Sequence, residues 1–188
     1  MHDTDVSISR IPPHNIDAEK AVLGAILLDN LALGAVLEVI EAGDFYPDGH
    51  RKIFSGIVEL SDSGVPADIV TLSSAMRDKG QLEKIGGMAY LCELVDDVAS
   101  AANVGHYAKI VKQTSIERAV IGAAVKMIDA IYSAEKSTAE AINDAQQVIL
   151  SLAVEGKNSK VRSAREVAKR TYNLIEERSK RKDGLTGL

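Results

Sequence analysis

The sequence predicts an all-α fold, and three observations support this prediction. Apolar residues recur at helical spacing along most of the chain, and no window keeps the strict alternation of a half-buried strand. Aromatic residues make up only 4% of the sequence and tryptophan is absent, so the core must be built from Leu, Ile, Val and Ala, which favours helices. Short polar segments divide the apolar stretches, as in a helical bundle.

A compact helical body is expected over residues 15–98, preceded by a flexible arm over residues 1–14. Pro12 and Pro13 prevent a helix before Asn15, whose side chain suits the N-cap position of the first helix. Later breaks are glycines, a proline expected in the first turn of the third helix, and an aspartate expected to cap the fourth. In chain order, the second helix carries Leu33, Val36, Leu37 and Ile40, and the breaks are Gly43, Pro47, Gly64, Asp68, Gly80 and Gly86-Gly87.

Residues 99–153 are expected to form a long helical hairpin. Its first helix runs from about Val104 to about Tyr132 and would be roughly 43 Å long. Two neighbouring apolar stripes follow this helix, and together they are wider than one packing partner covers. Ser137 and Glu140 have capping-box spacing, so a second helix should begin there. The stripes are Tyr107, Val111, Ile121, Val125, Ile128 and Tyr132, and Ile116, Val120, Ala123, Met127 and Ile131; the second helix carries Ile142, Ala145, Val148, Ile149 and Leu152. The surplus of apolar surface indicates an assembly element.

Beyond the hairpin, residues 154–182 are expected to form a polar linker followed by a charged linker helix. Ser163 and Glu166 have capping-box spacing at the start of that helix. One side of the helix carries Val167, Thr171, Leu174 and Ile175.

The net charge of −5 hides an asymmetry between the two ends of the chain. Residues 1–156 hold 12 Lys and Arg against 23 Asp and Glu, whereas residues 157–188 hold 10 against 4. An acidic body is a poor non-specific surface for nucleic acid, because contacts to phosphate supply most of that affinity. The basic tail fits either an acidic partner or a solvated linker helix.

The remaining composition points to a protein of a reducing compartment without a metal site. The single cysteine, Cys92, excludes an internal disulfide and a multi-cysteine zinc site. The four histidines are scattered, and His50 lies on an apolar helix face, where a core or boundary role is expected. The N-terminus lacks the apolar region of a signal peptide, and no apolar run approaches the length of a membrane span. We therefore expect a cytoplasmic protein with no membrane partner.

Several short motifs follow one another along the chain. They are Ile11–Glu19 followed by Ala21–Gly24, Asp44-Phe45-Tyr46 with His50 and Ile53-Phe54, Asp68 with Thr71-Leu72, Gly86–Leu91, Ser100–Asn103 and Asp183–Gly187. In order and spacing these motifs resemble the N-terminal part of bacterial replicative DNA helicases of the DnaB family over nearly the whole chain, from about residue 10 to residue 188.

The resemblance implies a specific assembly. In that family a helical body carries a helical hairpin, hairpins pair between subunits, and three pairs form a collar on one side of a hexameric ring. The collar binds primase and, in some species, the helicase loader. The linker helix, here about Ser163–Lys182, docks on the motor domain of the neighbouring subunit, so Val167, Thr171, Leu174 and Ile175 become its docking candidates. The motor domain hydrolyses ATP with Mg²⁺ and moves along single-stranded DNA.

The chain departs from a complete family member because it lacks the phosphate-binding loop of the motor, whose pattern is G-x-x-x-x-G-K-[ST]. One near miss occurs at Gly156-Lys157, with Ser151 in place of the first glycine and Asn158 in place of the hydroxyl residue. Residues 183–188 resemble the start of the connection to the motor domain. We therefore expect the N-terminal part of a longer helicase, with no catalytic residue or cofactor of its own.

Four residues are candidates for the interface with primase or with another subunit. By the resemblance, Tyr90, Ile121 and Met127 fall where the family's primase-responsive surface lies. Ile121 and Met127 also occupy different stripes of a helix that is too apolar for one neighbour, and Ile142 lies on the second hairpin helix. The alternative for these residues is an intramolecular contact or a contact between paired hairpins.

Two other functions are compatible with an all-α chain of this length. A self-contained nucleotide hydrolase or metal-dependent nuclease would need a phosphate loop or a cluster of His, Asp and Glu ligands, which the sequence does not offer. A stand-alone adaptor of the same fold would need no such site.

Overall fold

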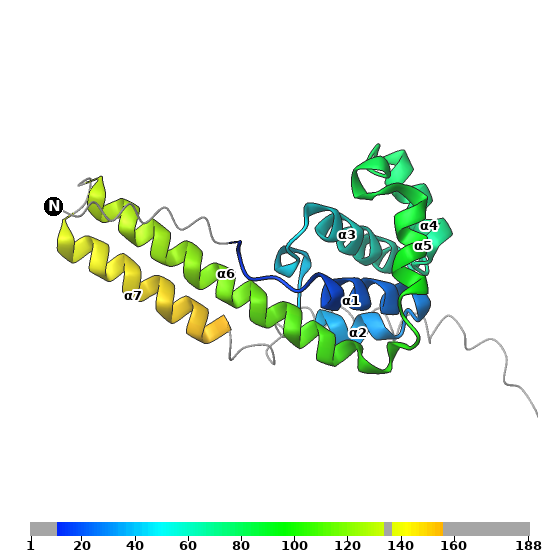
Figure 1. Cartoon of the computed structure of the whole chain (residues 1–188), viewed down its shortest axis with the longest axis horizontal. Coiled ribbons are helices and arrows are strands. Elements are labelled where there is room, and N and C mark those ends of the chain that lie inside the picture. The colour runs from blue at the N-terminus through cyan, green and yellow to red at the C-terminus, as the bar shows by residue number, and fades with distance from the viewer. Residues whose placement is uncertain (1–10, 134–136, 156–188) are drawn as a thin grey trace, which may run out of the picture.

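The computed structural model describes residues 11–133 and 137–155, and the regular structure within these ranges is entirely helical, which confirms the predicted fold class (Figure 1). No helix among these residues has the length and apolar character needed to cross a bilayer. The α-helices are α1 (Ile16–Leu28), α2 (Ala32–Leu37), α3 (Asp48–Asp62), α4 (Ile69–Asp78), α5 (Gly87–Asp96), α6 (Val104–Tyr132) and α7 (Thr138–Glu155). Short 3-10 helices lie at Ala42–Asp44, Glu83–Ile85 and Ala101–Asn103.

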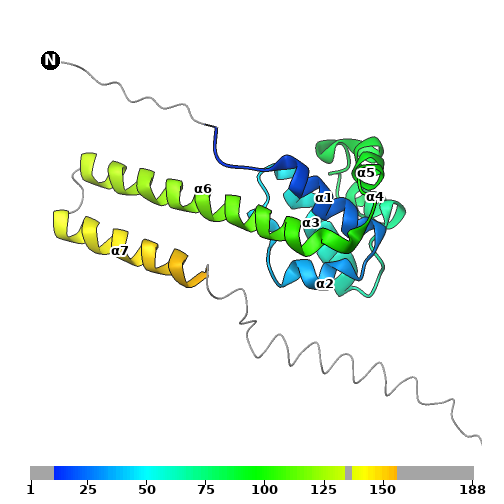
Figure 2. The ribbon, with the colours of Figure 1, turned by 60° about the horizontal axis from the view of Figure 1, so that its bottom comes forward.

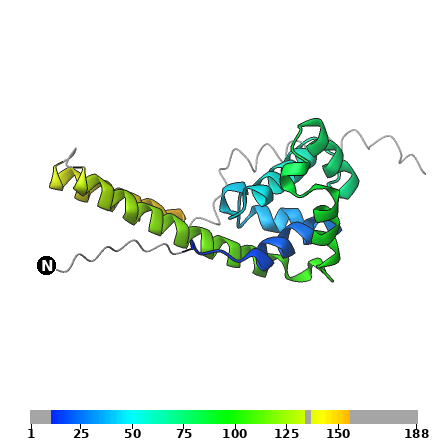
Figure 3. The same ribbon diagram turned by 45° about the horizontal axis from the view of Figure 1, so that its top comes forward.

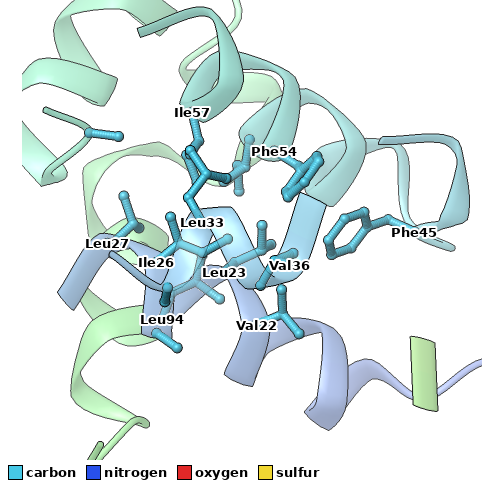
Figure 4. Packing of buried hydrophobic residues seen from close by; sticks show 14 of the residues in the cluster. Val22, Leu23, Ile26, Leu27, Leu33, Val36, Phe45, Phe54, Ile57 and Leu94 are labelled. Carbon is cyan, nitrogen blue, oxygen red and sulfur yellow. The ribbon is translucent and has the colours of Figure 1, made fainter. Parts of the chain in front are cut away.

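Helix α1 lies at the centre of the body and is covered by α2, α3, α5 and α6. Val22, Leu23 and Ile26 have no exposed surface, and the core continues into α3, α4 and α5 (Figure 4). An apolar helix that is buried on most sides needs neighbours all round, since every face left in water would forfeit hydrophobic stabilisation. The body is therefore organised as a shell of helices around α1.

The predicted capping residues begin the helices where they were expected. The Asn15 side chain accepts a hydrogen bond of 2.9 Å from the Ala18 N–H, and Asp68 accepts one of 2.8 Å from the Thr71 N–H. Gly80 adopts a positive φ of 63° just past the end of α4, a conformation that favours glycine. Local sequence was sufficient at these positions because each cap is made within a few residues of the chain.

Two helix boundaries differ from the expectation. Pro47 is the N-cap of α3 and adopts an extended conformation, so it precedes the first turn instead of lying in it. Helix α2 ends at Leu37, and Ile40 lies in the following connection, although it is buried. Ile40 continues the apolar pattern because it packs in the core, not because the helix continues.

Asn30 connects two loops that are far apart in the sequence. Its side-chain carbonyl accepts a hydrogen bond of 2.6 Å from the Ala67 N–H, and its amide donates one of 2.8 Å to the Ala67 carbonyl. Asn30 thus satisfies both polar groups of a buried backbone unit, as a neighbouring strand would. This contact spans 37 residues and could not be predicted from local pattern.

The long helix α6 belongs to the body at one end and to the hairpin at the other. Val104, Ala108 and Val111 are part of the buried cluster that surrounds α1. Beyond them α6 extends away from the body, and α7 runs back beside it (Figures 2 and 3). Within the described residues, one continuous helix therefore joins the hairpin to the core.

Gly24 on α1 provides a test of the packing between α1 and α5. A Cβ atom there would overlap the backbone carbonyl of Leu94, whereas a Cβ at Gly34 on α2 would meet nothing within 4 Å. We expect Gly24→Ala to destabilise the body by about 1–3 kcal/mol through overpacking. Gly34→Ala is the matched control and should be neutral or slightly stabilising, because alanine favours helix more than glycine does. Urea denaturation would measure both, and equal stabilities would contradict the close approach.

Candidate assembly surface

An exposed apolar stripe follows the outer part of α6. It consists of Ile121, Val125, Ile128 and Tyr132, which we call the outward stripe, with exposed fractions from 49% to 86%. Their spacing of four, three and four residues places them on one face of the helix. Ile121 lies about 200° around the helix from Ala123, which is buried under α7. The outward stripe therefore points away from the rest of its own hairpin.

The opposite face of α6 packs on α7. Ala123 is 8% exposed, and Met127 and Ala130 are partly buried beside it. A groove of about 350 Å³ runs between the two helices and is lined by Ala123, Lys126, Met127, Ala130, Asp144, Ala145, Gln147 and Val148. Met127 consequently lies between α6 and α7, on a different face from Ile121.

Helix α7 begins at the predicted capping box and exposes a further apolar face. The Ser137 N–H donates to Glu140 Oε2 at 2.9 Å, and the Glu140 N–H donates to Ser137 Oγ at 3.3 Å. Ile142 and Ile149 are 54% and 58% exposed, and their seven-residue separation places them on one face. Ile142 thus lies on an open surface of the hairpin.

Tyr90 lies on α5 in the body and takes part in a buried polar network. Its hydroxyl is 2.6 Å from His50 Nε2, and His50 Nδ1 is 2.7 Å from Glu19 Oε2. Since a carboxylate only accepts hydrogen bonds, His50 donates to Glu19 through Nδ1, which leaves Nε2 to accept a hydrogen bond from the Tyr90 hydroxyl. The structure thus confirms His50 as a hydrogen-bonded core histidine, with 3% of its surface exposed.

The remainder of the Tyr90 ring faces a charged surface. The Lys20 ammonium lies 5.6 Å from the ring centroid and pairs with Glu93 at 2.6 Å. Partial burial raises the pKa of the Tyr90 hydroxyl above its ordinary value of 10.0, and the positive charge of Lys20 opposes this shift. Tyr90 therefore stays a neutral hydrogen-bond donor at physiological pH.

The four interface candidates do not form one patch. Ile121, Met127 and Ile142 lie on three different faces of the hairpin, and Tyr90 belongs to α5 at the far side of the body (Figure 1). Direct contact of any of the four with another protein stays a prediction. The linker-helix candidates Val167, Thr171, Leu174 and Ile175 lie outside the described residues. Helix α7 continues through Ser151, so the near miss to a phosphate loop begins within a helix.

A cluster at the base of the hairpin was missed by the sequence analysis. Arg118 on α6 donates from Nη1 to the Pro13 carbonyl at 2.8 Å and also donates to the Asp44 carbonyl. Its guanidinium lies 5.6 Å from the centre of the Tyr46 ring. Lys112 donates to both carboxylate oxygens of Asp44, at 3.0 and 3.1 Å. These partners are separated by 68 residues or more, and no local pattern distinguishes Lys112 and Arg118 from Lys109 and Lys126, the other Lys or Arg residues of the same helix.

Two features of the described residues bear on the kind of site that they can form. They contain no group of three or more His, Cys, Asp or Glu side chains placed to hold a metal ion. Among the described residues, ten of the sixteen exposed large apolar side chains lie on the hairpin, namely the outward stripe and Val120, Ile131, Ile142, Val148, Ile149 and Leu150. The other six are distributed over the body and the segment before it, at Ile11, Leu28, Leu31, Val65, Val70 and Met88. Exposed apolar residues gathered along one hairpin suit burial against another protein.

Comparisons with known proteins show which family the chain resembles. A model of the DnaB-like helicase N-terminal domain matches residues 11–113. The replicative DNA helicase DnaC of Bacillus subtilis is 37% identical over 185 residues, which are 98% of this chain and 41% of that protein. The replicative DNA helicase DnaB of Geobacillus stearothermophilus is 36% identical over 179 residues, or 95% of this chain and 39% of the relative. The chain spans about two fifths of the length of these curated relatives.

Two solved structures of DnaB-type helicases also resemble the chain. The N-terminal domain of DnaB helicase from Mycobacterium tuberculosis has a TM-score of 0.72 and 36% identity, over 75% of this chain and 99% of that domain. A DnaB-like replicative helicase, solved in a study of its interactions with primase, has a TM-score of 0.64 and 25% identity, over 87% of this chain and 36% of that one.

Charge substitutions at two adjacent residues of α6 can test the buried face and the exposed face of the helix independently. Ala123→Glu places a carboxylate beneath α7, where an unpaired charge is costly, so we expect α7 to detach from α6. Ala124→Glu, one residue further and exposed, should leave the hairpin intact. Hydrogen exchange of the α7 amides would show accelerated exchange in the first variant only. Equal protection of α7 in both variants would contradict the packing described here.

Proposed function

Since the chain belongs to the family of DnaB-like helicase N-terminal domains, we propose that it is the domain that assembles a replicative DNA helicase and docks its partners. The domain would carry out no chemistry of its own. Its hairpin would pair with the hairpin of another copy, and three such pairs would form the collar of a hexamer.

The observation that carries this proposal is the outward stripe. An isolated chain gains nothing from four large apolar side chains that face water on the side away from α7. Covering apolar surface contributes roughly 25 cal/mol per Å², before the costs of association are subtracted. A second hairpin offers a surface of matching length and chemistry, because it carries the same stripe. Pairing through the same surface on both copies also gives a closed dimer, because neither copy keeps an unpaired copy of that surface.

Partner docking is the second part of the proposal. One structurally similar helicase was studied with primase, and we propose that this chain also binds primase. The exposed Ile142 face of α7 and the part of the outward stripe left open after pairing would offer the contact area, with Ile121 as the candidate on α6. The other candidate, Met127, lines the groove between α6 and α7 and would meet a partner only there. Where the cell uses a helicase loader, the same collar would receive it.

The whole protein would supply what this chain lacks. We propose that a motor domain following residues 183–188 binds ATP and Mg²⁺ and unwinds duplex DNA while moving on single-stranded DNA in the bacterial cytoplasm. The linker helix of residues 163–182 would dock on a neighbouring motor through Val167, Thr171, Leu174 and Ile175. The collar would then set the spacing of six motors by geometry alone.

The assembly role predicts that charge on the outward stripe breaks pairing. We expect the double variant Ile121→Asp, Ile128→Asp to shift the chain from dimer or higher species to monomer at micromolar concentration. The control is Val70→Asp, which also charges an exposed apolar residue, but on α4 in the body. Light scattering across a concentration series measures the mass, and circular dichroism checks that the body stays folded. Unchanged mass in the stripe variant would refute the pairing surface.

Primase docking can be tested separately from pairing. We expect Ile142→Asp to weaken capture of primase by about tenfold or more, as loss of a central apolar contact does, while the oligomeric mass stays unchanged. The measurement is a titration of purified bacterial primase against the immobilised chain. If primase binds the Ile142 variant and the unaltered chain equally well, the α7 face is not the docking site.

A further inference from the structure

Arg118 stands at the point where α6 leaves the body. Its two nitrogen donors bind carbonyls of two different segments, Pro13 in the chain before α1 and Asp44 in the connection before α3. A planar guanidinium with fixed donor directions accepts little rotation once two acceptors are in place. Arg118 therefore restrains the direction of the outer part of α6 and not merely its distance from the body.

The segment before α3 that accepts the Arg118 hydrogen bond is itself held by several side-chain contacts. The Asp44 side chain is 4% exposed and accepts hydrogen bonds from the Glu41 N–H at 2.9 Å and from Lys112. The Tyr46 ring stacks on His14 with centroids 4.5 Å apart, while Arg118 lies against it. The arm before α1 and the connection before α3 are thus held together around one side chain of α6.

A chain of hydrogen bonds connects the contacts around Arg118, at the base of the hairpin, to Tyr90 on α5. The Tyr46 N–H donates to Glu19 Oε1 at 2.9 Å, and the other Glu19 oxygen accepts from His50, whose second nitrogen meets the Tyr90 hydroxyl. Glu19 is fully buried, so losing one of these partners would leave a buried carboxyl oxygen without its hydrogen bond, which costs free energy and favours movement of its surroundings. A change at Tyr90 therefore reaches Tyr46 through three hydrogen bonds, and Arg118 through a fourth contact, in which its guanidinium lies 5.6 Å from the Tyr46 ring centroid.

We propose that Arg118, Asp44, Tyr46, Glu19, His50 and Tyr90 form a body–hairpin latch that fixes the direction of α6. In this proposal Tyr90 is a positioning residue. It influences what the hairpin binds by holding Arg118 in place, and it need not touch a partner. The consequence for partner binding rests on the proposed function, whereas the latch itself does not.

A small change in the direction of α6 at Arg118 produces a large displacement at the outer end of the hairpin. Helix α6 extends roughly 21 Å from Arg118 to Tyr132. A tilt of about 10° at Arg118 would move the outer end by roughly 4 Å, which is close to the width of one side chain. That displacement is enough to misalign an apolar stripe with its partner, because packed surfaces tolerate little offset.

The test measures the angle between body and hairpin directly. The chain would carry Ser74→Cys on α4 and Asp129→Cys on α6 for spin labelling, and Cys92→Ser to remove the native thiol. Pulsed electron paramagnetic resonance would then measure the distance between the two labels. Dilution with unlabelled chain removes signals between subunits. We expect Arg118→Gln to broaden the distance distribution by roughly 4 Å. Lys109→Gln, an exposed cation earlier on α6 with no such partners among the described residues, is the matched control and should leave it unchanged.

Tyr90→Phe is the decisive variant because it removes one hydroxyl and leaves the ring in place. We expect it to broaden the same distribution, and the double variant with Arg118→Gln to broaden it no more than Arg118→Gln alone, since both act on one device. An unchanged distribution in Tyr90→Phe overturns the latch, and so does additive broadening in the double variant.

The two proposals fail in different ways. Reduced primase binding by Tyr90→Phe with an unchanged body–hairpin distance would make Tyr90 a direct contact, which overturns the latch and leaves the proposed function standing. Broadened distances with an unaltered oligomeric mass in the outward-stripe variant would support the latch and refute the pairing surface.

Discussion

The long helix α6 has to satisfy two packing environments at once, and the rest of the structure depends on this constraint. Its first turns bury Val104, Ala108 and Val111 against α1, and its outer turns bury Ala123 against α7. A helix with only one apolar stripe would serve one environment. Because α6 carries stripes on two faces, the hairpin keeps an unused apolar surface after both intramolecular contacts are made. That remainder is what an assembly domain requires.

The junction between body and hairpin is held by polar side chains, although the body core and the packing between α6 and α7 are mainly apolar. Arg118, Lys112 and Asp44 meet there, and Glu19 and His50 extend the polar contacts into the core. Buried charge is weak support for stability, since desolvation offsets most of the attraction. Hydrogen bonds of fixed direction do restrict geometry, and geometry is the property that a collar of paired hairpins would need.

Much of the local structure could be predicted from the sequence because its causes are local. Asn15, Asp68 and the Ser137–Glu140 capping box act within one turn of helix. The spacing of apolar residues on α6 predicted two stripes, and α7 packs on Ala123 and Met127 of one while the outer residues of the other stay exposed. The errors arose where tertiary contacts replaced local rules: Ile40 is buried without being helical, and Pro47 precedes its helix because the connection before α3 is extended.

The sequence by itself determined the helices, their caps and the surplus of apolar surface on the hairpin, because periodicity and capping depend on residues within a few positions of one another. Only the tertiary structure decided which stripe α7 covers, so that Met127 turns inward and Ile121 outward. It also brought Arg118 to Pro13 and Asp44, and Tyr90 to His50. These pairs lie 40 to 105 residues apart, and no short-range pattern encodes which of many polar side chains will meet when helices pack.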